Sequence, residues 1–222
     1  MSGERLSRDI MAARIASEFQ DGWVVNLGIG MRTMCSDFAP AGRTIIYHSE
    51  NGVLGFGRIA SGDEISPYLV NAGSQPVTLT PYASIVHHAD SFAIVRAGFL
   101  DAAVLGSYEV AINGDFANWK TPGRKGGGIG GAMDIASCAK RVFLMMEHTT
   151  RGGDSRLLKR CTLPLTAPGV IKLVMTDVGL FEPAGDAFRA LELAPGFSHE
   201  EVQVLTDAPV IFDGVKELEI HL

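Results

Sequence analysis

Cysteine is scarce in this chain of 222 residues. The three cysteines, Cys35, Cys138 and Cys161, are odd in number and far apart. A disulfide framework needs paired cysteines and a structural zinc site needs clusters such as CxxC, so the sequence favours neither. We therefore expect a protein of the reducing cytoplasm.

Excess basic charge and long apolar runs are also missing. Asp and Glu outnumber Lys and Arg by 25 to 19, whereas a nucleic-acid surface needs clustered Lys and Arg. No stretch reaches the roughly 18 apolar residues of a membrane span. The N-terminal segment carries acids and an amphipathic helix pattern instead of the basic and apolar regions of a signal peptide. We expect no nucleic-acid partner, no membrane partner and no targeting signal.

The chain does have enough apolar residues for a core, 46% of the total against 20% charged. Strand-like and helix-like segments alternate, which predicts an α/β fold with an open, mostly parallel sheet and helices on both faces. The predicted strands cover residues 23–27, 44–48, 76–79, 102–105, 141–146, 170–176 and 187–193, and the predicted helices 8–20, 32–38, 89–97, 154–160 and 198–205. Without repeats or linkers, residues 1–222 are interpreted as a single domain.

Glycines follow two of the predicted strands, at Gly28-Ile29-Gly30 and in Ser49-Glu50-Asn51-Gly52. Ligands of open α/β sheets bind beyond the carboxyl ends of strands, so both segments could face one crevice. The first is either a phosphate-binding turn or a plain tight turn. In the second, glycine neighbours leave the Glu50 carboxylate approachable in a cleft, although a solvated turn acid is the alternative.

Residues 123–131 contain six glycines in nine positions, including Gly130 and Gly131. Consecutive glycines allow backbone N–H groups to converge on an anion or oxyanion, but a flexible loop has the same composition. The preceding segment 113–119, which includes Asn118, combines turn residues with two aromatics, as in a structured binding loop.

His87, His88 and Asp90 are candidate metal ligands by residue type. Adjacent histidines in an extended segment point to opposite sides, which disfavours a shared metal. The favoured interpretation is a helix cap at Asp90 beside one packed and one exposed histidine, and no metal site.

Taken together, several motifs resemble the β subunit of family I CoA-transferases over residues 7 to 182. They are VNLGIG (25–30), SENGVLGFG (49–57), LVNAG (69–73), DSFAIVRAG (90–98), GDFANW (114–119) and GGIGGAMD (127–134). The resemblance implies a scaffold shared with sugar-phosphate isomerases. It also implies that Glu50 is a nucleophile that carries coenzyme A as a glutamyl-CoA thioester.

The resemblance further implies that the backbone N–H of Gly131 stabilises the tetrahedral oxyanion. The matching motifs assign substrate and coenzyme A binding to Asn51, Gly28, Gly30, Gly130, Asn71 and Asn118. Coenzyme A is then a substrate, and no cofactor is needed. An α subunit is expected to complete the active site in an α2β2 assembly.

Substrate assignment depends on five departures from the family pattern: Arg32 in place of proline, Ser74, Tyr82, Phe99 and Glu109. The expected donor is succinyl-CoA and the expected acceptor a 3-oxo acid, 3-oxoadipate or acetoacetate, while Tyr82 and Phe99 could reshape the pocket. Two alternatives remain. One is an acyl-CoA hydrolase or ring-opening enzyme on the same scaffold, and the other a non-catalytic ligand-binding module.

Overall fold

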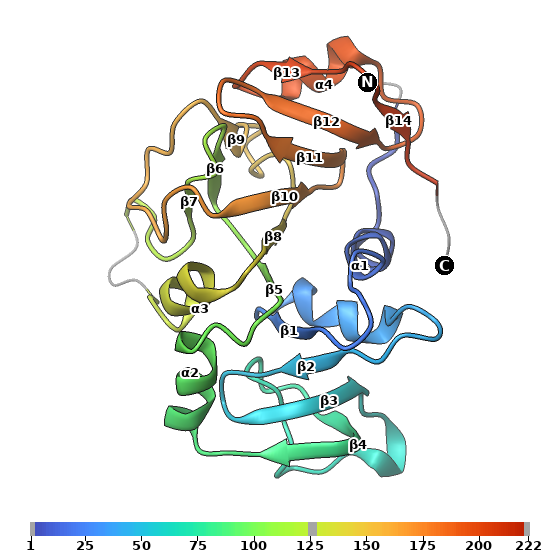
Figure 1. Cartoon of the computed structure of the whole chain (residues 1–222). Helices are drawn as coiled ribbons and strands as arrows, with labels where there is room; N and C mark the ends of the chain where they lie inside the picture. The colour runs from blue at the N-terminus through green and yellow to red at the C-terminus, as the bar shows by residue number, and fades with distance from the viewer. Residues whose placement is uncertain (1–2, 124–127, 220–222) are drawn as a thin grey trace.

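The computed structural model describes residues 3–123 and 128–219. Its main sheet has the order β13-β12-β11-β10-β8-β5-β1-β2-β3-β4, with β14 paired to β12, and it runs from the top to the bottom of Figure 1. The centre is parallel and consists of β2 (Ile46–His48), β1 (Val24–Leu27), β5 (Ala102–Leu105), β8 (Val142–Met145) and β10 (Ile171–Met175). The predicted open, mostly parallel sheet is confirmed.

Antiparallel strands extend both sides of this centre. At one end lie β3 (Val53–Ile59) and β4 (Val77–Ile85), and at the other β11 (Gly179–Pro183) and β12 (Phe188–Leu193). Two short strands, β13 (Val210–Ile211) and β14 (Lys216–Glu217), pair with β12. A separate small sheet joins β7 (Phe116–Ala117), β6 (Glu109–Ala111) and β9 (Leu157–Leu158).

The central strands are buried on both faces. Ala102 and Val104 of β5 belong to one apolar cluster and Ala103 and Leu105 to another, because successive side chains of a strand point to opposite faces. Strands of this kind appear in the sequence as continuous apolar runs, which is why they were predictable.

Helices cover both faces, as predicted. Buried residues of α1 (Arg8–Ala16) and of the 3-10 helix η1 (Met31–Phe38) contribute to the first cluster. Buried residues of α2 (His88–Arg96), α3 (Ala132–Cys138) and α4 (His199–Leu205) contribute to the second. A short 3-10 helix, η2 (Gly62–Glu64), lies beyond β3. In Figure 1, α2 and α3 lie on the opposite side of the sheet from α1.

Several predicted elements need correction. Ser7 caps α1 as expected, with its side chain accepting from Ile10 N, but the helix ends at Ala16 instead of residue 20. No helix forms over 154–160, because Leu157 and Leu158 pair with β6. The strands β3 and β11 were not predicted.

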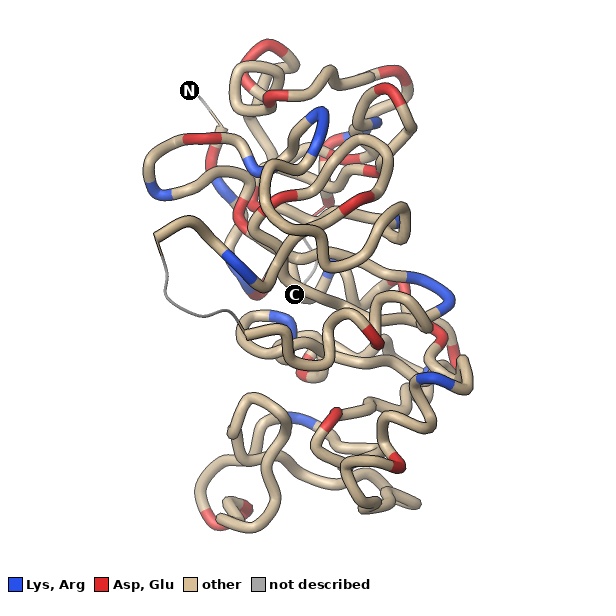
Figure 2. Tube along the Cα trace, turned by 90° about the vertical axis from the view of Figure 1, so that its left-hand side faces the viewer, with Lys and Arg blue, Asp and Glu red and all other residues tan. Residues whose placement is uncertain are grey.

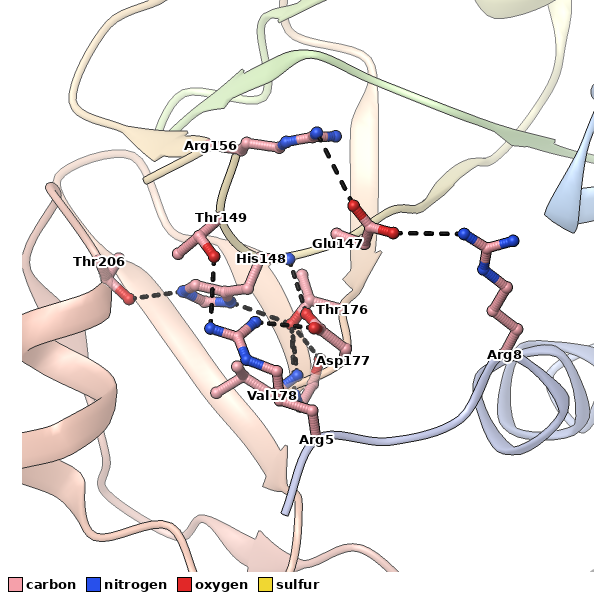
Figure 3. Close-up of polar contacts among 11 residues, drawn as sticks. Arg5, Arg8, Glu147, His148, Thr149, Arg156, Thr176, Asp177, Val178 and Thr206 are labelled. Atoms are coloured by element: carbon pink, nitrogen blue, oxygen red, sulfur yellow. Dashed lines mark hydrogen bonds and ion pairs between the residues drawn. The ribbon is translucent and has the colours of Figure 1, made fainter. Parts of the chain in front are cut away.

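The N-terminal segment is tied to the far part of the sheet by a partly buried polar cluster (Figure 3). Arg5 donates to Asp177 at 2.7 Å, and the other Asp177 oxygen accepts from the backbone N–H of His148 at 2.7 Å. The His148 ring lies between the hydroxyls of Thr176 and Thr206, at 3.0 and 2.9 Å. Burial lowers the pKa of His148 to about 4, so the ring is neutral at physiological pH.

Charged residues are interspersed along the trace, with short acidic and basic stretches on several sides of the molecule (Figure 2). Within residues 3–123 and 128–219, none of the helices combines the length and apolar character that crossing a bilayer requires.

Candidate active site

A tight turn between β2 and β3 presents Glu50. Gly52 N donates to Ser49 O at 2.9 Å, which places Glu50 and Asn51 at the two central positions of the turn. Gly52 has φ of 110°, and a Cβ there would collide with Val86 O. Only glycine fits this position. The turn conformation therefore depends on Gly52, and it fixes the place from which the Glu50 side chain extends.

A buried polar network supports this turn from below. The His48 ring contacts Asn26 Nδ2 through Nδ1 at 2.9 Å and Ser91 Oγ through Nε2 at 2.9 Å. Since the amide nitrogen of Asn26 donates, the ring proton lies on Nε2. Burial lowers the pKa of His48, which keeps the ring neutral. Ser91 Oγ also donates to Ser49 O at 3.3 Å, directly before Glu50.

Gly131 lies directly against the Glu50 carboxylate. A Cβ at residue 131 would collide with Glu50 Oε2 and with the ring of Phe92. The Gly131 backbone has φ of −87°, which any residue can adopt, so the requirement for glycine comes from space and not from backbone strain. Gly131 precedes α3, whose first N–H groups have no partners within the helix. The carboxylate therefore packs against backbone that carries hydrogen-bond donors.

His88 contacts the same turn from α2. Its Nδ1 donates to Glu50 O at 2.8 Å, and its ring packs edge-on to Phe92 with centroids 4.9 Å apart. The predicted cap at Asp90 is wrong: His87 caps α2, with its ring nitrogen accepting from Ala89 N at 3.1 Å. Both histidines are largely exposed, in contrast to the predicted packed and exposed pair. Among residues 3–123 and 128–219, no group of acids, histidines and cysteines could hold a metal ion.

Glu50, Gly131 and the loops after β1 and β5 line a cavity of about 370 Å³. It collects the ends of β1, β2, β5 and β8, together with the start of α3, as expected at the carboxyl edge of a parallel sheet. Of the predicted site residues, the lining includes Glu50, Gly131, Gly28, Gly130 and Asn118, and it does not include Gly30, Asn51 or Asn71. Part of the predicted glycine nest, residues 124–127, lies outside the described residues.

The three predicted asparagines are held by hydrogen bonds within the chain. Asn51 donates to Val70 O at 2.8 Å. Asn71 is buried, and its Oδ1 accepts from Gly73 N and Gln75 N at 2.9 and 3.1 Å. Asn118 donates to Gly106 O at 3.0 Å, so it positions the loop after β5 while lining the cavity.

The five departures from the family pattern have different places. Tyr82 and Phe99 are exposed, by 101% and 63%, and neither lines the cavity, so the expected reshaping by these residues is not observed. Ser74 adopts a left-handed backbone with φ of 61° in an outer loop. The Glu109 carboxylate accepts from Thr162 and Leu163 and holds a surface loop. Arg32 alone of the five lines the cavity.

The Glu50 side chain is half-buried and, among the described residues, its carboxylate has neither a hydrogen-bond donor nor an ion-pair partner. An acid that serves only structure is normally paired when it is partly buried. An unpaired carboxylate in a cavity is available to a ligand, either as a nucleophile or as a base. The polar network of Asn26, His48 and Ser91 was missed by sequence reasoning, and only the polar residues in otherwise buried strands hinted at it.

A family model and two similar relatives point to the same family. The model of the family described as "Coenzyme A transferase" matches residues 8–205. The chain is 41% identical over 210 residues to one subunit of the 3-oxoadipate CoA-transferase of Pseudomonas putida, an alignment that covers 94% of this chain and 98% of the relative. It is 40% identical to one subunit of the succinyl-CoA:3-ketoacid coenzyme A transferase of Helicobacter pylori, with 97% and 100% covered.

Solved structures share the fold at low sequence identity. The apoenzyme of an acyl-CoA transferase from Escherichia coli O157:H7 superposes with a TM-score of 0.74 at 20% identity, over 96% of this chain. The match covers 43% of that protein, so the chain spans less than half of its length.

Proposed function

Because the chain belongs to the coenzyme A transferase family, we propose that it moves coenzyme A between an acyl-CoA and a free carboxylic acid, with Glu50 as the nucleophile. The observation that carries the proposal is the unpaired Glu50 carboxylate, which faces a cavity and packs directly against Gly131. The turn of Ser49 to Gly52 presents this carboxylate, and the buried His48 network holds the turn.

The first half of the reaction forms two covalent intermediates. A Glu50 carboxylate oxygen attacks the thioester carbonyl, the tetrahedral oxyanion collapses, and coenzyme A leaves as the thiolate, which gives an acyl-glutamyl anhydride. The thiolate then attacks the glutamyl carbonyl and expels the acid as its carboxylate. The product is a glutamyl-CoA thioester on Glu50.

The second half runs these steps in reverse with the acceptor acid. The acceptor carboxylate attacks the glutamyl thioester, and the released thiolate attacks the acceptor side of the new anhydride. A new acyl-CoA leaves and the Glu50 carboxylate is regenerated. Donor, acceptor and nucleophile are all carboxylates, so each exchange is between species of similar energy. Water would hydrolyse either intermediate, and the cavity must exclude it during the reaction.

Gly131 supports this chemistry through its backbone. Its N–H is proposed to donate to the oxyanion of each tetrahedral intermediate, a contribution typically worth about 10²- to 10³-fold in kcat. Gly28, Gly130 and Asn118 line the same cavity and are proposed to contact the substrate or coenzyme A. Gly30, Asn51 and Asn71 are proposed to act through the shape of the adjoining loops.

The relatives support proposals for the substrates and the partner. Their names support succinyl-CoA as donor and 3-oxoadipate or another 3-keto acid as acceptor, and we propose acetoacetate as the alternative 3-keto acid. Each of these relatives is named as a single subunit of its enzyme, which supports a separate α subunit as the partner of this chain. We propose an α2β2 assembly in the cytoplasm. Coenzyme A serves as substrate, and no cofactor is required.

The test uses the chain co-expressed with its α subunit. After incubation with succinyl-CoA, mass spectrometry of the peptide that contains Glu50 should show a coenzyme A adduct, and acyl exchange with acetoacetate or 3-oxoadipate should proceed. Glu50→Gln removes the nucleophile at equal size and should abolish both results. Glu64→Gln, the same change at an exposed acid of η2, is the matched control and should preserve them.

Full exchange by the Glu50→Gln complex would overturn the proposal. Free coenzyme A that accumulates without an acceptor, and without an adduct on Glu50, would instead support the hydrolase alternative.

A further inference from the structure

Arg32 is a partly buried cation without an acid. Its Nε is fully buried and has no hydrogen-bond partner, and none of the described acids lies within ion-pair distance of its guanidinium. The group packs flat on the loop after β5, where a Cβ at Gly106 would lie 2.5 to 2.9 Å from its three terminal atoms. Burial lowers the pKa of Arg32, although an arginine remains charged.

A second arginine, Arg156, lines the same cavity. Arg156 Nη1 donates to Ser107 O at 3.4 Å, so Arg156 contacts the residue that follows Gly106. Its Nε is also buried without a partner. Figure 3 shows Glu147 between Arg156 and Arg8, and these contacts measure 4.0 and 3.4 Å. Glu147 is therefore shared by two arginines, and this end of the cavity has an excess of positive charge.

The positive end and the nucleophile are separated by two strand spacings of the main sheet. Gly106 and Ser107 follow β5, whereas Glu50 follows β2, and β1 lies between these strands. Two interstrand spacings amount to about 10 Å. Glu50 and Arg32 line the same cavity and do not form an ion pair. The cavity therefore has a carboxylate that can react at one end and free guanidinium donors at the other.

A buried charge without a counter-charge is costly, and such a group is normally paired. Arg32 has no partner in the described chain, so a ligand that enters the cavity is the natural source of the missing anion. Arginine presents a planar fork that matches a carboxylate through two parallel hydrogen bonds. A cavity of about 370 Å³ has room for a short acyl group.

We propose that Arg32 binds a carboxylate at the far end of the acyl group and thereby makes the complex prefer acyl groups of dicarboxylic acids. The inference rests on the proposed function, because it takes Glu50 as the site of acyl attack. Arg32 is then a specificity-determining residue, and Arg156 lines the same cavity.

The experiment compares two acyl donors of equal carbon number, with the complex that contains both subunits. Succinyl-CoA has a distal carboxylate and butyryl-CoA has none, and acetoacetate is the common acceptor. Arg32→Met keeps the length of the side chain and removes the charge. It should lower kcat/KM for succinyl-CoA by about 10- to 100-fold, the range for a lost hydrogen bond to a charged group, and change kcat/KM for butyryl-CoA by less than about 3-fold.

Arg32→Lys keeps the charge without the fork and should give an intermediate value for succinyl-CoA. Arg58→Met, which removes an exposed arginine paired with Glu64, is the control and should affect neither donor. A readout without turnover completes the design. Titration calorimetry with succinate should show binding to the wild-type complex and at least 10-fold weaker binding to Arg32→Met.

Equal loss for both donors would overturn the inference, because Arg32 would then bind a group common to them, such as a coenzyme A phosphate, or act only on folding. Unchanged kinetics for both donors would overturn it too. If the wild-type complex transfers from neither donor, the proposed function fails. The titration with succinate still decides the role of Arg32 in that case.

Discussion

Replacing Gly131 by alanine tests the contact on which the proposed chemistry depends. The added Cβ would collide with Glu50 Oε2 and the Phe92 ring. The backbone at residue 131 has φ of −87° and ψ of −2°, which alanine adopts without strain. The substitution therefore changes the position of the carboxylate and leaves the local chain path acceptable.

The size of the effect follows from the geometry. Non-bonded heavy atoms are comfortable at about 3.5 to 4.0 Å, so the carboxylate must retreat by about 1 Å. Glu50 lies in a turn held by Gly52 and by the buried network of His48, and the backbone cannot follow this movement. A misplacement of about 1 Å at a reacting group costs roughly 10²-fold in rate. Crowding of Phe92 should lower the free energy of unfolding by about 1 to 3 kcal/mol.

The assay is acyl exchange by the assembled complex, measured together with the yield of the coenzyme A adduct on Glu50. Thermal unfolding separates loss of rate from loss of fold. Gly152→Ala is the matched control, because a Cβ there meets only ordinary contacts of 3.4 and 3.6 Å in an exposed turn. A Gly131→Ala complex that folds and exchanges acyl groups at the wild-type rate would refute the placement of the carboxylate against Gly131.

Two further predictions concern the buried histidines. Ser91→Ala removes the hydroxyl between His48 and Ser49. Stopped-flow kinetics should show a lower kcat at nearly constant KM, and urea titrations should show a free energy of unfolding lower by about 1 to 3 kcal/mol. An unchanged kcat would exclude a positioning role for the network. His148 has a pKa of about 4 in the folded chain against about 6.5 when unfolded. The unfolded chain therefore takes up the proton first, and stability present above about pH 6.5 should fall by about 3 kcal/mol as the pH drops towards 4. His148→Gln should flatten this pH dependence in urea titrations, and an equally steep profile in the variant would assign the effect to other groups.

The sheet was predictable where burial alone determines the pattern. Residues 102–105 and 142–146 are continuous apolar runs because both faces of β5 and β8 are covered. Residues 154–160 were wrongly predicted as a helix, since Leu157 and Leu158 between basic residues also fit a helical face. Their pairing with β6 depends on a strand far away in the sequence, and local propensity cannot reveal such a partner.

The glycines after Glu50 have a second structural role, which the sequence analysis did not predict. Gly55 and Gly57 lie within β3, and a Cβ at residue 57 would lie 2.6 Å from Thr78 Oγ1 of β4. They allow close approach of a neighbouring strand, besides leaving room near the turn. Because glycine suits both purposes, the pattern predicted an open turn and concealed the strand that follows it.

The two ends of the cavity are built by separate parts of the chain, and this separation explains which site features the sequence could reveal. The turn of Glu50 is held by β2, β3 and α2, within the motifs that carry the family resemblance. Arg32 lies on η1, at one of the departures from the motif pattern, and packs against the loop after β5, so its burial depends on tertiary contacts. A change at residue 32 can therefore alter the preferred acyl group without moving the nucleophile. The consequence is testable across the two experiments: Gly131→Ala should slow exchange from succinyl-CoA and butyryl-CoA alike, whereas Arg32→Met should discriminate between them. If both variants showed the same donor dependence, the two ends of the cavity would not act independently.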